Sequence, residues 1–328
     1  MRKVIAAASI AVAVAGLSTV GLSGQAFAGR AHHGHGRHMH HHGARAVSAA
    51  APKASAWTYG KTYSSSWDEY QAMLAAAHGG SKKTFGQLPD WTGLWSQSTG
   101  FNFDPDQKGR MATAPLTPEY KARYELKIAN VQKGIEWDPL SACLPAGYPR
   151  WLVEPFLREY ILRPEQAWLM TEQQDEIRRV YLDGRGHMPE DEAYPLWEGD
   201  SIGFWDGDTL VIHTNHLMAG SYQRLQPDHS DKVTTVERMR KIGPDTIEDI
   251  IDIYDPEGLT RPWHVRHLYE RVKTPGLRIN HWSCEENNNV VKTDSGSSNF
   301  VLPGEAGYKD PNAIGPPPAP TAPKPGDH

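Results

Sequence analysis

From residue 156 to residue 284 the chain is a succession of short segments with strand-like alternation and no helical periodicity between them. Pro244-Asp245 and Pro275-Gly276 are turn signals between such segments, and Gly207 suits a tight hairpin turn because glycine tolerates positive φ. Strands that follow one another without intervening helices pair antiparallel, in a sheet that closes on itself or folds over. The expected strands are 156–162, 167–171, 175–182, 201–205, 209–215, 233–242, 246–254, 264–272 and 277–284.

Helices are expected only before this region. Thr117 is placed to cap a helix that Gly134 would end, and an earlier helix is expected at 67–77. The run Trp91-Thr-Gly-Leu-Trp95 is expected to open the sheet, and its Gly-x-Trp is similar to the first strand of lipocalin-like barrels. The expected fold is therefore mainly β, an antiparallel lipocalin-like (calycin-type) barrel with a short helical N-terminal preface.

The two ends of the chain differ in composition from the body. Residues 1–28 match a secretory signal peptide: a basic start, an apolar stretch and the cleavage pattern Ala26-Phe-Ala28, with an uncleaved anchor helix as the alternative. Residues 29–66 form a flexible His-rich arm and 304–328 a Pro-rich disordered tail, which leaves 67–303 as one barrel-like domain. These features predict a periplasmic or secreted protein.

Charge and motifs exclude several classes of function. The 328 residues carry a net charge of −5, and no basic stripe predicts a nucleic-acid partner. After the signal no run approaches the ~20 apolar residues of a membrane span. No Gly-rich dinucleotide turn, phosphate loop or Cys-x-x-Cys pair is present, so no organic cofactor is expected. A small-molecule ligand or substrate is the expected partner, and the oligomeric state is not predicted.

Cysteine and histidine are unevenly placed. The two cysteines, Cys143 and Cys284, are expected to pair in an oxidising compartment, with a nucleophilic thiol as the alternative. Imidazole suits Zn, Cu and Ni, so the arm is expected to bind such ions adventitiously, or else to be only a soluble, variable segment. Seven of the 16 histidines cluster there: His32, His33, His35, His38, His40, His41 and His42.

Charged residues share strand faces with apolar ones. Within 233–242, Glu237 shares a face with Met239, while Arg238 lies on the opposite face with Val236. One interpretation is a barrel with a partly polar interior that holds a small molecule. The other is a solvated outer face with salt bridges between strands.

The turn Asp183-Gly-Arg185-Gly-His187 contains the residue types of acid–base chemistry. His187 is the candidate acid or base and Asp183 its orienting carboxylate, with a simple polar turn as the alternative. His229 and Glu237 are the further catalytic candidates.

His213 and His216 are not expected to chelate a metal, because positions i and i+3 of a strand face opposite sides. Candidate substrate-binding residues are Arg178, Arg185 and Arg266 for an anionic group, Trp205 and Trp263 for a flat wall, and His281.

The run from Gly199 to Val211, GDSIGFWDGDTLV, resembles the signature of an uncharacterised family of secreted bacterial β-rich proteins. The segments 143–147, 183–187, 229–230, 237–238 and 255–263 also match that pattern. The chain departs from it after Cys284, where Glu285-Glu286-Asn287 replaces a His-Glu run. The resemblance implies a β-rich secreted domain and no particular activity.

Three functions remain open on the sequence. The first is an enzyme that acts on a small apolar or aromatic molecule by acid–base chemistry, as a lyase, isomerase or hydrolase. The second is a protein that binds a lipophilic ligand without turnover. The third is a metal-handling protein that uses the His-rich arm.

Overall fold

The computed structural model describes residues 63–109, 111–135, 138–282, 284, 290–292, 298–301, 304–305 and 308. The expected signal peptide, almost all of the His-rich arm and most of the Pro-rich tail therefore lie outside the described residues. Among the described residues, neither helix has the length and apolar character needed to span a lipid bilayer.

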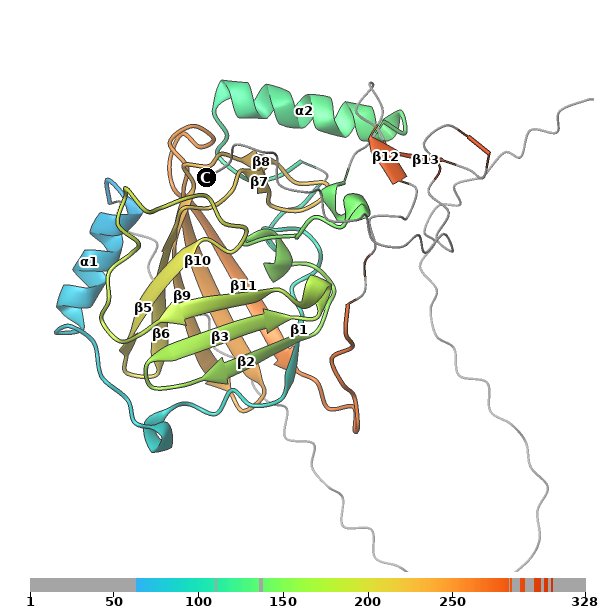
Figure 1. Ribbon diagram of the computed structural model, residues 1–328. Coiled ribbons are helices and arrows are strands. Elements are labelled where there is room, and N and C mark those ends of the chain that lie inside the picture. Colours follow the sequence, from blue (N-terminus) through green and yellow to red (C-terminus); the bar gives the residue numbers. More distant parts are fainter. Residues whose placement is uncertain are drawn as a thin grey trace, which may run out of the picture. The chain divides into compact units, whose positions relative to one another are not determined.

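Nine strands form a closed barrel in the order β1-β11-β10-β9-β6-β5-β4-β3-β2, with β2 paired back to β1 (Figure 1). The expectation of a mainly β barrel is confirmed. Every neighbouring pair is antiparallel except β4 and β5, which run parallel because the long connection 182–199 returns the chain to the same end. The strands are β1 (Leu94–Gln97), β2 (Arg158–Leu162), β3 (Gln166–Thr171), β4 (Ile177–Tyr181), β5 (Asp200–Asp206), β6 (Thr209–Asn215), β9 (Thr234–Gly243), β10 (Thr246–Tyr254) and β11 (Trp263–Arg271).

The local signals explain most element boundaries. Gly207 turns the β5–β6 hairpin at φ 57°, as its position predicts. The expected strand 277–284 is wrong, because residues 277–282 follow the turn at 275–276 and belong to no strand. Two small ladders were not expected, β7 (Gly220–Ser221) with β8 (Asp228–His229) and β12 (Val290–Lys292) with β13 (Ser298–Phe300).

Alternation sorts the strand residues between the interior and the exterior of the barrel. Aromatic residues dominate the interior, where Trp95, Tyr160, Trp205 and Tyr269 are each at most 3% exposed. On the outside, α1 (Ser66–Ala76) covers β6, β9 and β10, and its Tyr70 packs with Phe204 and other residues of β5, β6 and β9 (Figure 1). The predicted helix at 67–77 is therefore confirmed as an outer cover of the barrel.

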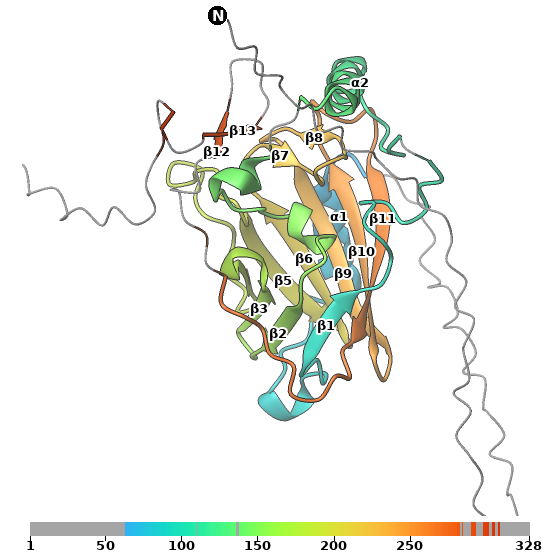
Figure 2. The same ribbon diagram turned by 90° about the vertical axis from the view of Figure 1, so that its right-hand side faces the viewer.

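One end of the barrel is covered by α2 (Pro118–Gln132), which lies across β7 and β8 (Figures 1 and 2). Lys127 of α2 donates to Ser221 and to Asp228 of that ladder, both at 2.8 Å. Thr117 precedes the helix as expected, but its hydroxyl donates to the carbonyl of Glu257 rather than to the helix amides. The helix end is thereby fastened to the loop after β10.

The disulfide between Cys143 and Cys284 is formed, as the sequence predicts, with a Cα–Cα distance of 5.7 Å. It joins the turn after the short 3-10 helix Pro139–Ala142 to the segment that follows β11. Neither cysteine is a free thiol, so a nucleophilic role for them is excluded.

Candidate functional site

Buried charged side chains stand inside the barrel among the aromatic rings. Arg158, Arg178, Glu237, Asp249 and His267 come from five different strands and are each at most 1% exposed. Each occupies an inward position of the strand alternation, next to apolar inward neighbours such as Met239 and Ile251 on β9 and β10. The interpretation of a partly polar interior is therefore correct for these strands.

Arg178 and Glu237 form an ion pair at the centre of this group. Nη1 of Arg178 lies 3.1 Å from Oε1 of Glu237, and Nη2 contacts Oε2. The guanidinium also donates to Ser201 and Thr214, and its Cζ lies 3.8 Å from the centre of the Tyr148 ring. Burial alone would lower the pKa of Arg178, but the charge of Glu237 outweighs burial and raises it.

The ion pair corrects two predicted roles. Glu237 was a catalytic candidate and Arg178 a candidate for holding an anionic group. In the structure Arg178 contacts both carboxylate oxygens of Glu237, and the two side chains are 0% exposed. Each therefore neutralises the other, and neither offers a free charge to a ligand.

Asp249 and His267 are directly opposite each other in the β10–β11 register and both face inward. Neither carboxyl oxygen of Asp249 and neither ring nitrogen of His267 has a hydrogen-bond partner among the described residues. Burial, reinforced by the charge of Glu237, raises the pKa of Asp249 well above its usual value. Burial, reinforced by Arg158, lowers the pKa of His267 to about 3. Burial therefore favours the neutral form of both groups, and in that form each offers a donor and an acceptor.

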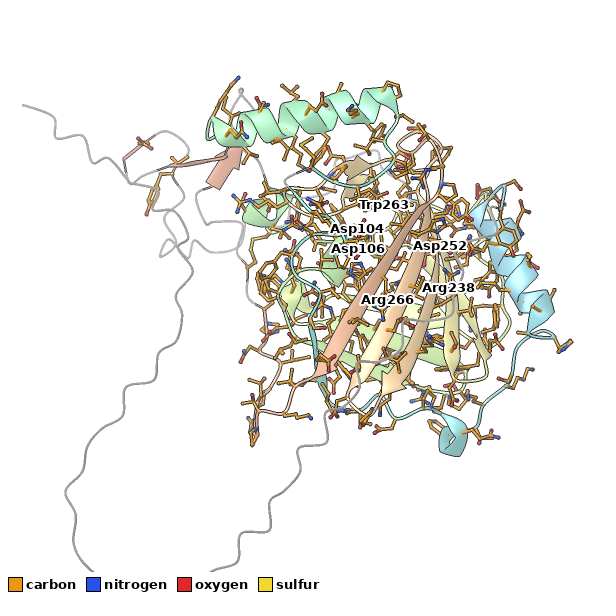
Figure 3. The ribbon with its side chains drawn as sticks, turned by 180° about the vertical axis from the view of Figure 1, so that it is seen from behind. Asp104, Asp106, Arg238, Asp252, Trp263 and Arg266 are labelled. Atoms are coloured by element: carbon orange, nitrogen blue, oxygen red, sulfur yellow. A yellow bond between two sulfur atoms is a disulfide. The ribbon has the colours of Figure 1, made fainter. Side chains whose placement is uncertain are left out.

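Further unpartnered polar atoms surround this pair. Within the described residues, Tyr160 Oη, Tyr222 Oη and Trp263 Nε1 are buried without a hydrogen bond. Phe103, from the loop before α2, packs its ring 5.3 Å from that of His267 and 5.2 Å from that of Trp263. In Figure 3, Trp263 lies beside Asp104 and Asp106 of the same loop. Phe103 therefore covers the His267 ring at the end of the barrel where Trp263 begins β11.

Outward-facing charges on the same strands pair with one another. Arg266, a predicted anion-binding residue, donates from Nε to Glu248 Oε1 at 2.6 Å, and Arg240 Nε donates to the other oxygen of the same carboxylate at 2.9 Å. Arg238 contacts Asp252 of β10 and donates to Glu69 of α1 at 2.8 Å, on the helix side of the sheet in Figure 3. Salt bridges between strands are therefore present on the outer face, as the second interpretation expects, but this face is not solvated there, because Arg238, Asp252 and Glu69 are each at most 5% exposed.

His187 is oriented by a different carboxylate from the one predicted. Asp183 accepts hydrogen bonds from Arg185 on the exposed turn, whereas Nδ1 of His187 lies 2.7 Å from Oδ2 of Asp200. The orienting role of Asp183 is therefore corrected to Asp200. This carboxylate lies at the start of β5, which pairs parallel with β4, and it contacts His187 and Met188 of the 182–199 connection.

From His187 a hydrogen-bonded chain continues to α1. Nε2 of His187 lies 2.6 Å from Nδ1 of His213 on β6, and Nε2 of His213 lies 2.9 Å from Oγ of Ser66. We call these four residues, Asp200, His187, His213 and Ser66, the Ser66–Asp200 chain. Three of them were not among the predicted site residues. Asp200 does lie in the GDS signature, but nothing local links Ser66 to His213, 147 residues away.

The other predicted site residues lie apart from one another. His229 is buried on β8 beneath α2, where burial lowers its pKa. Trp205 faces inward near Trp91, with ring centres 5.9 Å apart, and Trp263 lies near Phe103. His281 is exposed and pairs with Asp175. The structure thus does not join these residues into the one pocket that was expected.

The predicted metal ligands of the arm, 32–42, lie outside the described residues. Within the described ranges no group of three or more His, Cys, Asp or Glu side chains is arranged to hold a metal ion. His213 faces α1, while His216, at φ 51°, lies 3.4 Å from Glu190. The two side chains have different partners but line the same pocket, so the expected divergence to opposite sides of a strand is wrong: His216 lies just after the end of β6.

No protein-family model matches the sequence, and no curated protein matches it. Among solved structures, a secretary abundant heat soluble (SAHS) protein from Ramazzottius varieornatus is similar, with a TM-score of 0.26 and 11% sequence identity. The match covers 56% of this chain and 95% of that chain. At this level of similarity no residue role transfers from that protein.

Proposed function

We propose that this protein binds a small, uncharged, planar molecule inside the barrel, without turnover there. The observation that carries the proposal is the inward-facing pair Asp249 and His267, whose four polar atoms have no partner among the described residues. A buried polar group without a hydrogen bond costs about 1–3 kcal/mol. Native proteins satisfy nearly all such groups, through protein, water or ligand.

The chemistry of the interior defines the class of ligand. A neutral carboxyl and a neutral imidazole match a ligand that carries both a donor and an acceptor. The rings of Tyr160, Tyr269 and Phe103 line the same region and favour a flat, aromatic ligand. A long lipid tail fits poorly, because it would lie against the buried Arg178–Glu237 ion pair. The ligand is therefore better described as aromatic and polar than as lipophilic.

The test uses 4-hydroxybenzaldehyde as the probe, because it has one hydroxyl donor and one carbonyl acceptor on a ring. Isothermal titration is expected to give a submillimolar Kd, weakened at least about tenfold in Asp249→Leu and in His267→Phe, which corresponds to about 1.4 kcal/mol. Asp208→Asn, on the exposed β5–β6 turn, is the matched control and should bind like the wild type.

Toluene, which has the ring without the polar groups, should bind no more weakly to the two barrel variants than to the wild type. The proposal is contradicted if neither 4-hydroxybenzaldehyde nor 4-hydroxybenzamide binds the wild-type protein. It is also contradicted if a crystal soaked with the probe shows only ordered water between Asp249 and His267.

A further inference from the structure

The Ser66–Asp200 chain lies outside the barrel and is independent of the proposed interior site. One tautomer of each imidazole satisfies every bond of the chain. Nδ1–H of His187 donates to Asp200, Nδ1–H of His213 donates to Nε2 of His187, and the hydroxyl of Ser66 donates to Nε2 of His213. The hydroxyl of Thr234, 2.7 Å from Ser66 Oγ, is then the donor to that oxygen. Every proton of the chain therefore points from the serine toward the carboxylate.

The pKa values of Asp200 and His213 favour the movement of a proton from the serine toward the carboxylate. Burial alone would raise the pKa of Asp200, but hydrogen bonds from His187 and from the amide of Met188 outweigh it and hold the pKa below its usual value. Burial, with the nearby His187, lowers the pKa of His213 to about 3. His213 therefore does not keep an added proton near pH 7, and Nε2 of His187, whose other ring nitrogen lies 2.7 Å from Asp200, is the acceptor next to it.

Ser66 opens onto a pocket of about 730 Å³, lined also by Trp67, His187, Met188, His213 and Glu190. The Trp67 ring is 43% exposed and its centre lies 5.3 Å from that of His213, so it offers an apolar wall next to the serine. Ser66 and Trp67 begin α1, and the first amides of a helix have no acceptor within the helix. A nucleophile, a proton path and an apolar wall thus meet at one pocket, next to the first turn of α1.

We propose that Ser66 is the nucleophile of an esterase site for small carboxylic esters with an aromatic or short apolar group. Ser66 Oγ forms a bond to the ester carbonyl carbon and gives its proton to Nε2 of His213, as Nδ1–H of His213 passes to His187. The amides of Ser66 and Trp67 donate to the oxygen that becomes negative.

Collapse of the tetrahedral intermediate breaks the bond to the alcohol, which leaves with the proton returned through His213. Water then attacks the acyl-Ser66 ester by the same proton path and releases the carboxylic acid. Asp200 is a positioning residue, because it acts through His187 and does not line the pocket, whereas His187 lines the pocket and receives the proton from His213.

The same chain would be present if its role were only to fasten α1 to the barrel, so the test must detect chemistry. The full-length protein is incubated with an alkyl fluorophosphonate and with p-nitrophenyl acetate, and modified peptides are located by mass spectrometry. The fluorophosphonate is expected to label Ser66, and the ester to give a burst of nitrophenol with an acetyl group on Ser66. Ser66→Ala should abolish both, while Ser64→Ala, on an exposed serine two residues earlier, should retain both.

Asp200→Asn is expected to slow labelling about 100-fold with little change in KM for the ester, since it acts on proton transfer and not on binding. If Ser66→Ala fails to fold, the thiol of Ser66→Cys provides a second readout: it should be alkylated by iodoacetamide at least about tenfold faster than the thiol of Ser64→Cys. The proposal is overturned if the wild type is not labelled, if the label lies on another residue, or if the two thiols react at equal rates.

Discussion

Replacing Glu237 by glutamine would leave the guanidinium of Arg178 charged inside the barrel. Both side chains are 0% exposed, and Nη1 lies 3.1 Å from Oε1. At an effective dielectric constant of 20 this separation corresponds to an attraction of about 5 kcal/mol. Removing one partner of a buried pair typically costs about 3–5 kcal/mol. Because glutamine keeps one acceptor, we expect the free energy of unfolding to fall by about 3 kcal/mol.

The double variant Glu237→Leu/Arg178→Met tests whether the two side chains stabilise the fold as a pair or independently of each other. Removal of both charges leaves no unpaired ion, and the hydroxyls of Ser201 and Thr214 keep their mutual hydrogen bond of 2.9 Å. The double variant should therefore lose less than about 2 kcal/mol, well below the sum of Glu237→Leu and Arg178→Met alone. Urea unfolding followed by tryptophan fluorescence measures each value.

The exposed pair Arg163–Glu165 is the control, with N and O 2.9 Å apart. Glu165→Gln should leave the urea midpoint unchanged, because exposed ion pairs add little. A cost below about 1 kcal/mol for Glu237→Gln would contradict a stabilising buried ion pair, and so would a double variant that loses the full sum of the single losses.

Three further predictions follow from other contacts. Cys143→Ser/Cys284→Ser should lower stability by roughly 5 kcal/mol, because the disulfide closes a separation of 141 residues; an unchanged melting temperature would contradict this. Gly203→Ala should cost about 1–3 kcal/mol, since its Cβ would lie 2.6 Å from the carbonyl oxygen of Val211, whereas Gly86→Ala meets open space; equal urea midpoints for the two variants would contradict the packing. The pKa of His267 is lowered to about 3, so the unfolded chain binds more protons between pH 6.5 and 3 and stability falls with falling pH. Between pH 7.5 and 5.5 the wild type should lose about 1 kcal/mol more than His267→Phe, and parallel pH profiles would argue against a neutral buried imidazole.

Much of the fold follows from local pattern. The strands after residue 156, the turn at Gly207 and the helices before the sheet were predicted in nearly their observed places, because alternation, helical spacing and turn residues act over a few positions. The segment 277–284 shows the limit of this reasoning. It has the pattern of a strand, but no edge is left for it once β1 and β2 close the barrel.

The candidate sites were predicted only in part, since residue type and chain proximity were the sole guides. His187 was identified, but Asp183 was chosen to orient it because it is four residues away. In the structure the partner is Asp200, 13 residues along the chain, because β5 pairs parallel with β4 and begins beside His187. Asp249 and His267 were not distinguished from other strand residues, because alternation does not say which face points inward.

The sequence by itself determined the strand-rich body, the alternation of each strand and the two cysteines that pair. The tertiary structure decided which face became the interior, and therefore which charges became an ion pair inside the barrel and which became salt bridges on its outer face. It also brought Ser66 to His213 across 147 residues. Local elements depend on neighbouring residues, whereas these contacts depend on strand order and register, which are fixed only when the whole barrel closes.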